Sequence, residues 1–71
     1  MNTTPTQDSL SELRDFVVVQ ATEDAVLPRD ERLYQAEVVE DVLKHEPLKP
    51  RQIKKLVHEY YTGVASHLKA A

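Results

Sequence analysis

The sequence predicts a mainly α protein: a small three-helix domain that follows a disordered N-terminal tail. Two long segments, residues 30–45 and 50–69, carry apolar residues at the spacing of one helix face. Pro47 and Pro50 stand between these segments, and two prolines so close together interrupt a continuous helix. The 71 residues suffice for one domain, and the absence of cysteine leaves that domain without a disulfide.

The start of the chain is polar. Residues 1–9 contain one apolar side chain, that of Met1, and so have almost nothing to bury. We therefore expect residues 1–9 to form the tail and residues 10–71 to form the single helical domain. Ser9 and Glu12 have the spacing of a capping box, in which the two side chains satisfy backbone amides at a helix start.

The first helix is expected over residues 10–20, where apolar residues recur at helical spacing from Leu10. Residues 17–19 are three consecutive valines, and β-branched side chains favour strands. A short strand over 16–20 is therefore the alternative. Residues 22–27 form a connector that leads into Pro28.

The second helix is expected to begin near Pro28 and to reach about residue 45. Its apolar residues fall in one broad arc, and acidic residues crowd the other side. The arc contains Tyr34, Ala36, Val38, Val39, Val42 and Leu43. We expect Val38, Val39, Val42 and Leu43 to form the core with the third helix.

The third helix has the strongest pattern. Its apolar stripe comprises Ile53, Leu56, Val57, Tyr60, Tyr61, Val64 and Leu68. Because the stripe continues past Gly63 without a shift in phase, one helix from Pro50 to about residue 69 is favoured over an early end. Tyr60 is expected in the core, and Tyr61, farther round the helix, is expected to be partly exposed.

The net charge of −3 is unevenly divided. Residues 1–43 carry three basic and ten acidic residues, whereas residues 44–71 carry six basic and two acidic residues. Such a division bears on association rather than on fold. The candidate partner-binding residues come from both halves: Arg51, Lys54, Lys55, His58, Glu37, Asp41 and Tyr61.

The basic side of the third helix has two interpretations. A basic helix after a short turn is typical of a helix-turn-helix DNA-binding protein. However, the turn holds two prolines and the whole chain is acidic, so a solvated helix face is the simpler interpretation. The acidic side of the second helix, with Glu37 and Asp41, is either solvated as well or opposes a basic partner surface.

No catalytic, metal-binding or cofactor-binding site is expected. No two of His45, His58 and His67 are four residues apart, so none of the pairs has the usual spacing of helical metal ligands. His45 falls near a helix C-terminus, and His67 falls at the edge of the apolar stripe, where it is expected to be packed. No glycine-rich loop is available to bind phosphate, and so small a domain offers little concave surface.

The expected location is the cytoplasm. The longest apolar runs, residues 16–19 and 25–27, are far too short to cross a bilayer, so no membrane partner is expected. The N-terminus lacks the basic and apolar regions of a secretory signal.

In length, opening and general character, the whole chain resembles small bacteriophage-encoded regulators of host transcription, which act as inhibitors and antiterminators. The resemblance runs from Met1-Asn2-Thr3-Thr4 through residues 48–55 to Tyr60-Tyr61. It implies a complex with bacterial RNA polymerase, at the large catalytic subunits near the sigma contacts. It further implies loss of sigma and shut-off of host promoters, with DNA binding by the protein itself not expected. The alternatives are a helix-turn-helix regulator and a structural or assembly adaptor.

Overall fold

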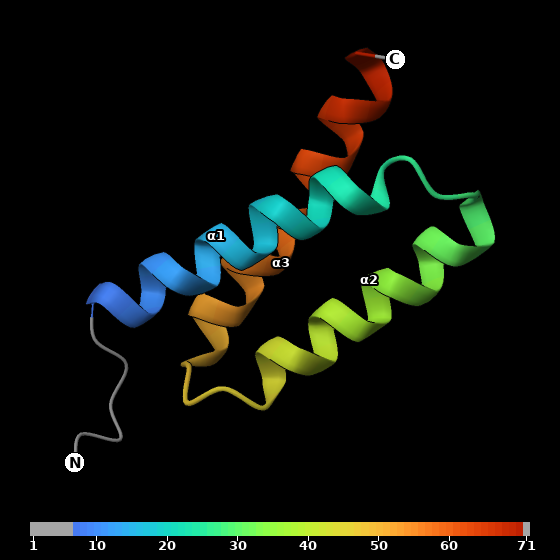
Figure 1. Ribbon diagram of the computed structural model, residues 1–71. Helices are drawn as coiled ribbons and strands as arrows, with labels where there is room; N and C mark the ends of the chain where they lie inside the picture. The colour runs from blue at the N-terminus through green and yellow to red at the C-terminus, as the bar shows by residue number, and fades with distance from the viewer. Residues whose placement is uncertain (1–6, 71) are drawn as a thin grey trace.

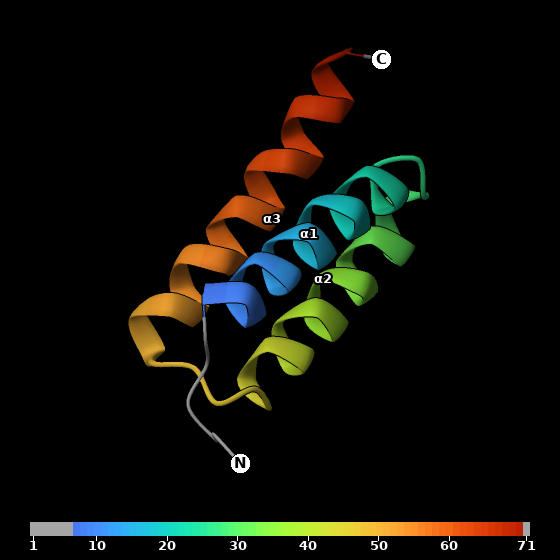
Figure 2. The same ribbon diagram turned by 60° about the vertical axis from the view of Figure 1, so that its left-hand side comes forward.

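A computed structural model describes residues 7–70 as three helices, α1 (Gln7–Asp24), α2 (Arg29–Lys44) and α3 (Pro50–Ala70). The helices α1 and α2 are antiparallel neighbours, and α3 returns in the direction of α1 (Figures 1 and 2). The C-terminal end of α3 extends past the connection between α1 and α2. The mainly α fold with three helices is thus confirmed.

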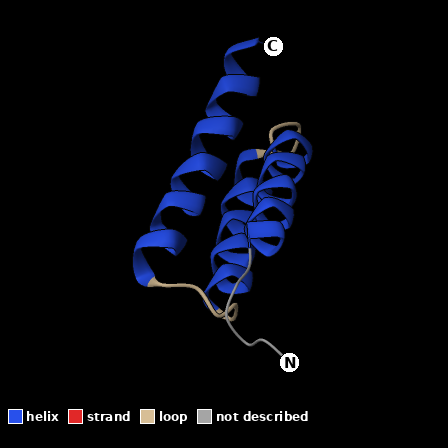
Figure 3. Cartoon of the chain, turned by 90° about the vertical axis from the view of Figure 1, so that its left-hand side faces the viewer, coloured by secondary structure: helices blue, strands red, loops and turns tan. Residues whose placement is uncertain are grey.

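The first helix is longer than its sequence predicts. Residues 16–20 are helical, so the alternative strand is wrong, and residues 7–70 contain no strand (Figure 3). Burial decides the matter: Val17 and Ala21 are one helical turn apart and both enter the core, which outweighs the weak strand preference of valine. Residues 7–9, assigned above to the tail, belong to α1, so Ser9 lies inside the helix and not at its N-cap. The rest of the expected tail, residues 1–6, lies outside the described residues.

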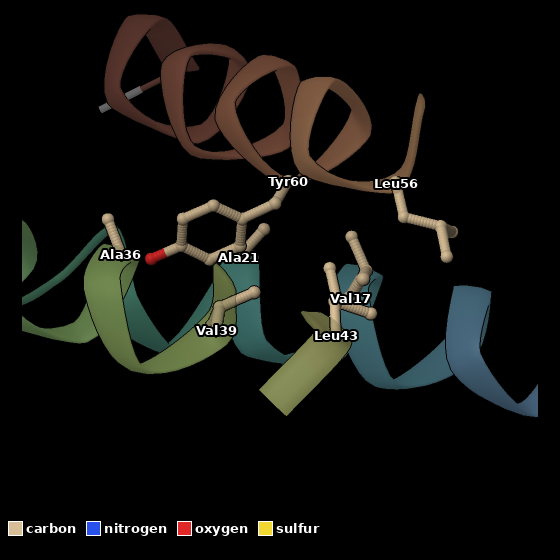
Figure 4. Packing of buried hydrophobic residues seen from close by; sticks show 7 residues of the cluster. All are labelled: Val17, Ala21, Ala36, Val39, Leu43, Leu56 and Tyr60. Atoms are coloured by element: carbon tan, nitrogen blue, oxygen red, sulfur yellow. The ribbon is translucent and has the colours of Figure 1, made fainter. Parts of the chain in front are cut away.

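The core lies where the three helices meet. Its buried members are Val17 and Ala21 from α1, Ala36, Val39 and Leu43 from α2, and Leu56 and Tyr60 from α3. Figure 4 shows the Tyr60 ring reaching from α3 toward Ala36 and Val39 of α2 and Ala21 of α1. The expected burial of Val39, Leu43, Leu56 and Tyr60 is therefore confirmed.

Two expected core residues, Val38 and Val42, are exposed instead. The reason is that α3 packs more extensively on α1 than on α2, so only a narrow side of α2 is covered. Residues 36, 39 and 43 occupy that side at helical spacing.

Gly63 explains how closely α1 and α3 approach each other. A Cβ atom added at Gly63 would lie 2.9 Å from the Cβ of Ala21, closer than two carbon atoms can pack. The glycine does not end the helix, because α3 continues to Ala70. The continuous third helix is therefore confirmed, and Gly63 serves its packing against α1.

A buried polar network joins the end of α1 to α3. Asp24 is only 2 % exposed. Its carboxylate accepts a 2.6 Å hydrogen bond from the Tyr60 hydroxyl and a 3.0 Å hydrogen bond from the Gln20 amide. Because a buried carboxyl without hydrogen bonds would be strongly destabilising, these two donors allow α1 to end inside the protein.

Candidate docking surface

The outward side of α2 carries exposed apolar side chains. Tyr34 is 65 % exposed, Val38 37 % and Val42 38 %. They are spaced four residues apart and so form one line along the helix, which we call the α2 stripe (Tyr34, Val38 and Val42). Contiguous exposed apolar residues bordered by polar ones are typical of protein-binding surfaces.

Acidic side chains border the α2 stripe. Glu37 and Asp41, two of the candidate residues, line a shallow hollow on this surface together with Tyr34 and Val38. In the described part of the chain Glu37 forms no ion pair, and the nearest cation for Asp41 is His45, whose Nδ1 lies 3.9 Å from Oδ1. His45 carries charge only when protonated. This surface therefore has an apolar centre, the α2 stripe, and an acidic edge formed by Glu37 and Asp41.

His45 ends α2 as its sequence position predicts. Its Nδ1–H donates a 2.7 Å hydrogen bond to the carbonyl oxygen of Asp41, which is one of the last carbonyls of the helix. This bond gives a hydrogen-bond partner to a backbone carbonyl in the last turn of α2.

Tyr61 connects the acidic side of α2 to α3. Its hydroxyl donates a 3.1 Å hydrogen bond to Oε1 of Glu40, and Lys44 lies 4.0 Å from the other carboxylate oxygen. Partial burial raises the pKa of Tyr61, and the bond to Glu40 and the charge of Glu37 raise that pKa further. Two candidate residues, Tyr61 and Glu37, are thus brought close together. Tyr61 is exposed, as expected, and its ring packs edge-on against Tyr60 at 5.5 Å between centroids.

The basic candidates form a separate group. Arg51, Lys54, Lys55 and His58 are all exposed along the first half of α3. Helix geometry places them opposite Tyr60, and none of them forms an ion pair with any residue between 7 and 70. Lys55 lines a crevice together with Leu10 and Arg14 of α1 and with Gln52 and Leu56. No ion pair joins this basic group to Glu37 or Asp41 in the described residues.

His67 does not pack into the core, contrary to expectation. It is exposed, and its Nε2 lies 3.0 Å from the hydroxyl oxygen of Thr22. The core ends before this turn, because α3 extends past the end of α1. Within residues 7–70, no group of three or more His, Cys, Asp or Glu side chains has the arrangement of a metal site.

Sequence reasoning missed the exposure of the α2 stripe, because it assigned Val38 and Val42 to the core. The signal was the width of the apolar arc. From Tyr34 to Ala36 that arc covers about half of the helix circumference. This is more than the narrow side of α2 that the other two helices cover. A single packed side therefore leaves part of this arc exposed.

Comparison with known proteins identifies no relative: no protein family, no curated protein and no solved structure matches the chain. Among the described helices, none has both the length and the apolar character needed to span a membrane.

Proposed function

We propose that the protein regulates transcription by binding bacterial RNA polymerase and lowering sigma-dependent initiation, with antitermination as a related outcome. The observation that carries a binding function is the exposed α2 stripe bordered by Glu37 and Asp41. The polymerase as partner rests on the resemblance of the whole chain to phage-encoded regulators of host transcription.

The stripe supplies the contacts that give affinity in protein complexes. Tyr34 carries a large ring with a polar tip, and such residues dominate the binding energy of many interfaces. Val38 and Val42 extend the apolar contact along the helix. The complementary polymerase surface is apolar at its centre, with lysine or arginine at its edge to face Glu37 and Asp41.

The basic group on α3 acts differently. Arg51, Lys54, Lys55 and His58 are exposed and form no ion pair within residues 7–70, so they attract acidic surfaces at a distance. In a large enzyme the two charged groups engage two separate regions. Charge of this kind speeds encounter and fixes orientation more than it adds affinity. Reversing Lys54 and Lys55 to Glu therefore slows association, and added salt weakens binding moderately.

Inhibition follows if the occupied polymerase surface overlaps that of sigma. The protein then competes with sigma, and initiation falls as the protein concentration rises. No DNA contact by the protein is required for this mechanism.

The test is initiation in vitro. Purified holoenzyme is mixed with a sigma-dependent promoter and increasing amounts of the protein, and the short initial transcripts are measured. The proposal predicts a dose-dependent decrease, release of sigma from the enzyme, and no shift of free promoter DNA. If initiation is undiminished and the protein binds a promoter DNA fragment, the helix-turn-helix alternative is supported instead. That DNA binding should fall steeply with salt, because it depends on phosphate contacts.

A further inference from the structure

A second surface lies on another side of α2, where the start of that helix faces the second half of α3. It is a groove of about 180 Å³. Its walls are formed by Leu33 and Ala36 of α2 and by Tyr61 and Val64 of α3, with the ring of Tyr60 also contributing. An apolar cavity of about 150 Å³ accepts a benzene molecule, so this groove has room for one aliphatic or aromatic side chain.

The rim of the groove is both apolar and accessible. Leu33 is 58 % exposed and Tyr61 48 %. Leu68, farther along the projecting end of α3, is exposed as well. A partner segment with one apolar side chain in the groove would therefore make further apolar contacts outside it, along the line between α2 and α3.

Two arginines, Arg29 and Arg32, also line the groove, and no carboxylate does. Neither arginine forms an ion pair within residues 7–70. Arg32 is held in position because its Nη1–H donates a 2.9 Å hydrogen bond to the carbonyl oxygen of Leu27. The nearest acidic residues in sequence, Asp30 and Glu31, point about 100° and 200° round the helix from Arg29. Glu40 is bonded to the Tyr61 hydroxyl at the rim, and Lys44 lies 4.0 Å from its other carboxylate oxygen. The two arginines therefore supply the positive charge in the lining of the groove, beside an apolar floor.

This combination selects the chemistry of the occupant. Arginine binds carboxylates through paired N–H donors, and the apolar floor requires an apolar side chain close to that carboxylate. A nucleic acid strand fits less well, because it needs a track of cations and the groove has only two. The antiparallel α2 and α3 form the kind of groove in which an amphipathic helix lies.

A second copy of the chain is the other occupant to consider. Its α2 stripe, with Glu37 and Asp41, is acidic and apolar. However, stripe-in-groove contact joins two different surfaces, so repeated contacts give rings or open-ended chains and not a symmetric pair. Groove-on-groove contact would oppose arginine to arginine, and stripe-on-stripe contact would oppose carboxylate to carboxylate. A symmetric dimer through either surface is thus disfavoured.

We propose that this groove is a binding site for an acidic amphipathic helix of a partner protein. One apolar side chain of that helix enters between Leu33 and Tyr61, and an adjacent carboxylate pairs with Arg29 and Arg32. The inference concerns a different side of α2 from the α2 stripe and does not require that the partner be RNA polymerase.

The test uses the full chain and two synthetic peptides. One is a fluorescein-labelled amphipathic helix with leucine along one stripe and glutamate and alanine elsewhere; the other has lysine in place of each glutamate. We expect the acidic helix to bind and the lysine helix to bind at least about tenfold more weakly. Amide shifts in the nuclear magnetic resonance spectrum should change within residues 29–36 and 60–64.

Matched variants locate the site. Arg29→Glu should weaken binding of the acidic helix about tenfold, whereas Lys49→Glu, a reversal of an exposed charge in the connection between α2 and α3, should alter it less than about twofold. Leu33→Ala should also weaken binding without unfolding the protein, since Leu33 is exposed. Equal losses for Arg29→Glu and Lys49→Glu would overturn the proposal. So would equal binding of the two peptides, or displacement of the labelled peptide by single-stranded RNA.

Discussion

The hydroxyl of Tyr60 lies 2.6 Å from Oδ2 of Asp24, and both side chains are only 2 % exposed. The two residues are 36 positions apart and connect the end of α1 to the middle of α3. Since the Gln20 amide donates to the other oxygen of Asp24, each carboxylate oxygen accepts one hydrogen bond. This network therefore helps to set how α1 and α3 are aligned.

Removing the Tyr60 hydroxyl should destabilise the fold. Tyr60→Phe leaves Asp24 buried with one donor fewer, and an unsatisfied buried polar group costs about 1–3 kcal/mol. Tyr61→Phe is the matched control, because its hydroxyl bonds Glu40 at the surface and its loss should cost less than about 1 kcal/mol. Urea titration measures both, and equal midpoints for the two variants would contradict the structural importance of the network.

Alkaline pH should destabilise the protein through the same residue. Burial raises the pKa of Tyr60 above its ordinary value of 10.0, and the bond to Asp24 raises it further. The neutral phenol therefore contributes stability that is fully present below pH 10 and is lost as pH rises toward the folded-state pKa. Melting temperatures between about pH 8 and pH 11 should fall more steeply for the natural chain than for Tyr60→Phe. Parallel curves would refute this assignment.

The fold was largely predictable because helix periodicity and proline position are local signals. The apolar stripe of α3 and the prolines at 47 and 50 located the last two helices to within a few residues. The burial of Asp24 was not predictable, since an acid within an expected connector looks solvated in sequence, and its partner Tyr60 is distant along the chain. The packing role of Gly63 likewise depends on Ala21, which only the folded arrangement brings near.

Gly63→Ala should destabilise the protein although alanine favours helix. The added methyl would lie 2.9 Å from the Ala21 Cβ, so α1 and α3 must separate. Overpacking of this kind costs about 1–3 kcal/mol, which exceeds the gain of about 1 kcal/mol in helix propensity. The compensating variant Ala21→Gly with Gly63→Ala should recover part of the loss. A stability for Gly63→Ala above that of the natural chain, measured by thermal unfolding, would show that the helices are not in close contact there.

The same substitution at two adjacent valines of α2 should change the free energy of unfolding by different amounts. Val39 is buried, so Val39→Ala should cost about 2 kcal/mol for the two carbons removed and the space left behind. Val38 belongs to the α2 stripe, so Val38→Ala should change the free energy of unfolding by less than about 0.5 kcal/mol. Chemical denaturation of both variants checks the orientation of α2. The reverse order would mean that Val38 faces the core.

The candidate docking surface was only partly predictable. Charge runs identified Glu37, Asp41 and the basic residues of α3, because exposed charges are visible in sequence. The apolar part was hidden, since a wide arc does not say which half meets a neighbour in the same chain. Arg29 and Arg32 gave no signal at all, because their groove requires α3 beside the start of α2.

The most direct measurement of the central claim is the affinity of the labelled protein for purified bacterial RNA polymerase, as core enzyme and as holoenzyme. Two matched variants accompany it: Val38→Asp in the α2 stripe and Val18→Asp on the exposed side of α1. We predict a complex at micromolar concentration or below, at least about tenfold weaker for Val38→Asp and unchanged for Val18→Asp, because only the former places an unpaired charge in the interface. Absence of a complex at micromolar polymerase, or equal binding by the two variants, would contradict the account.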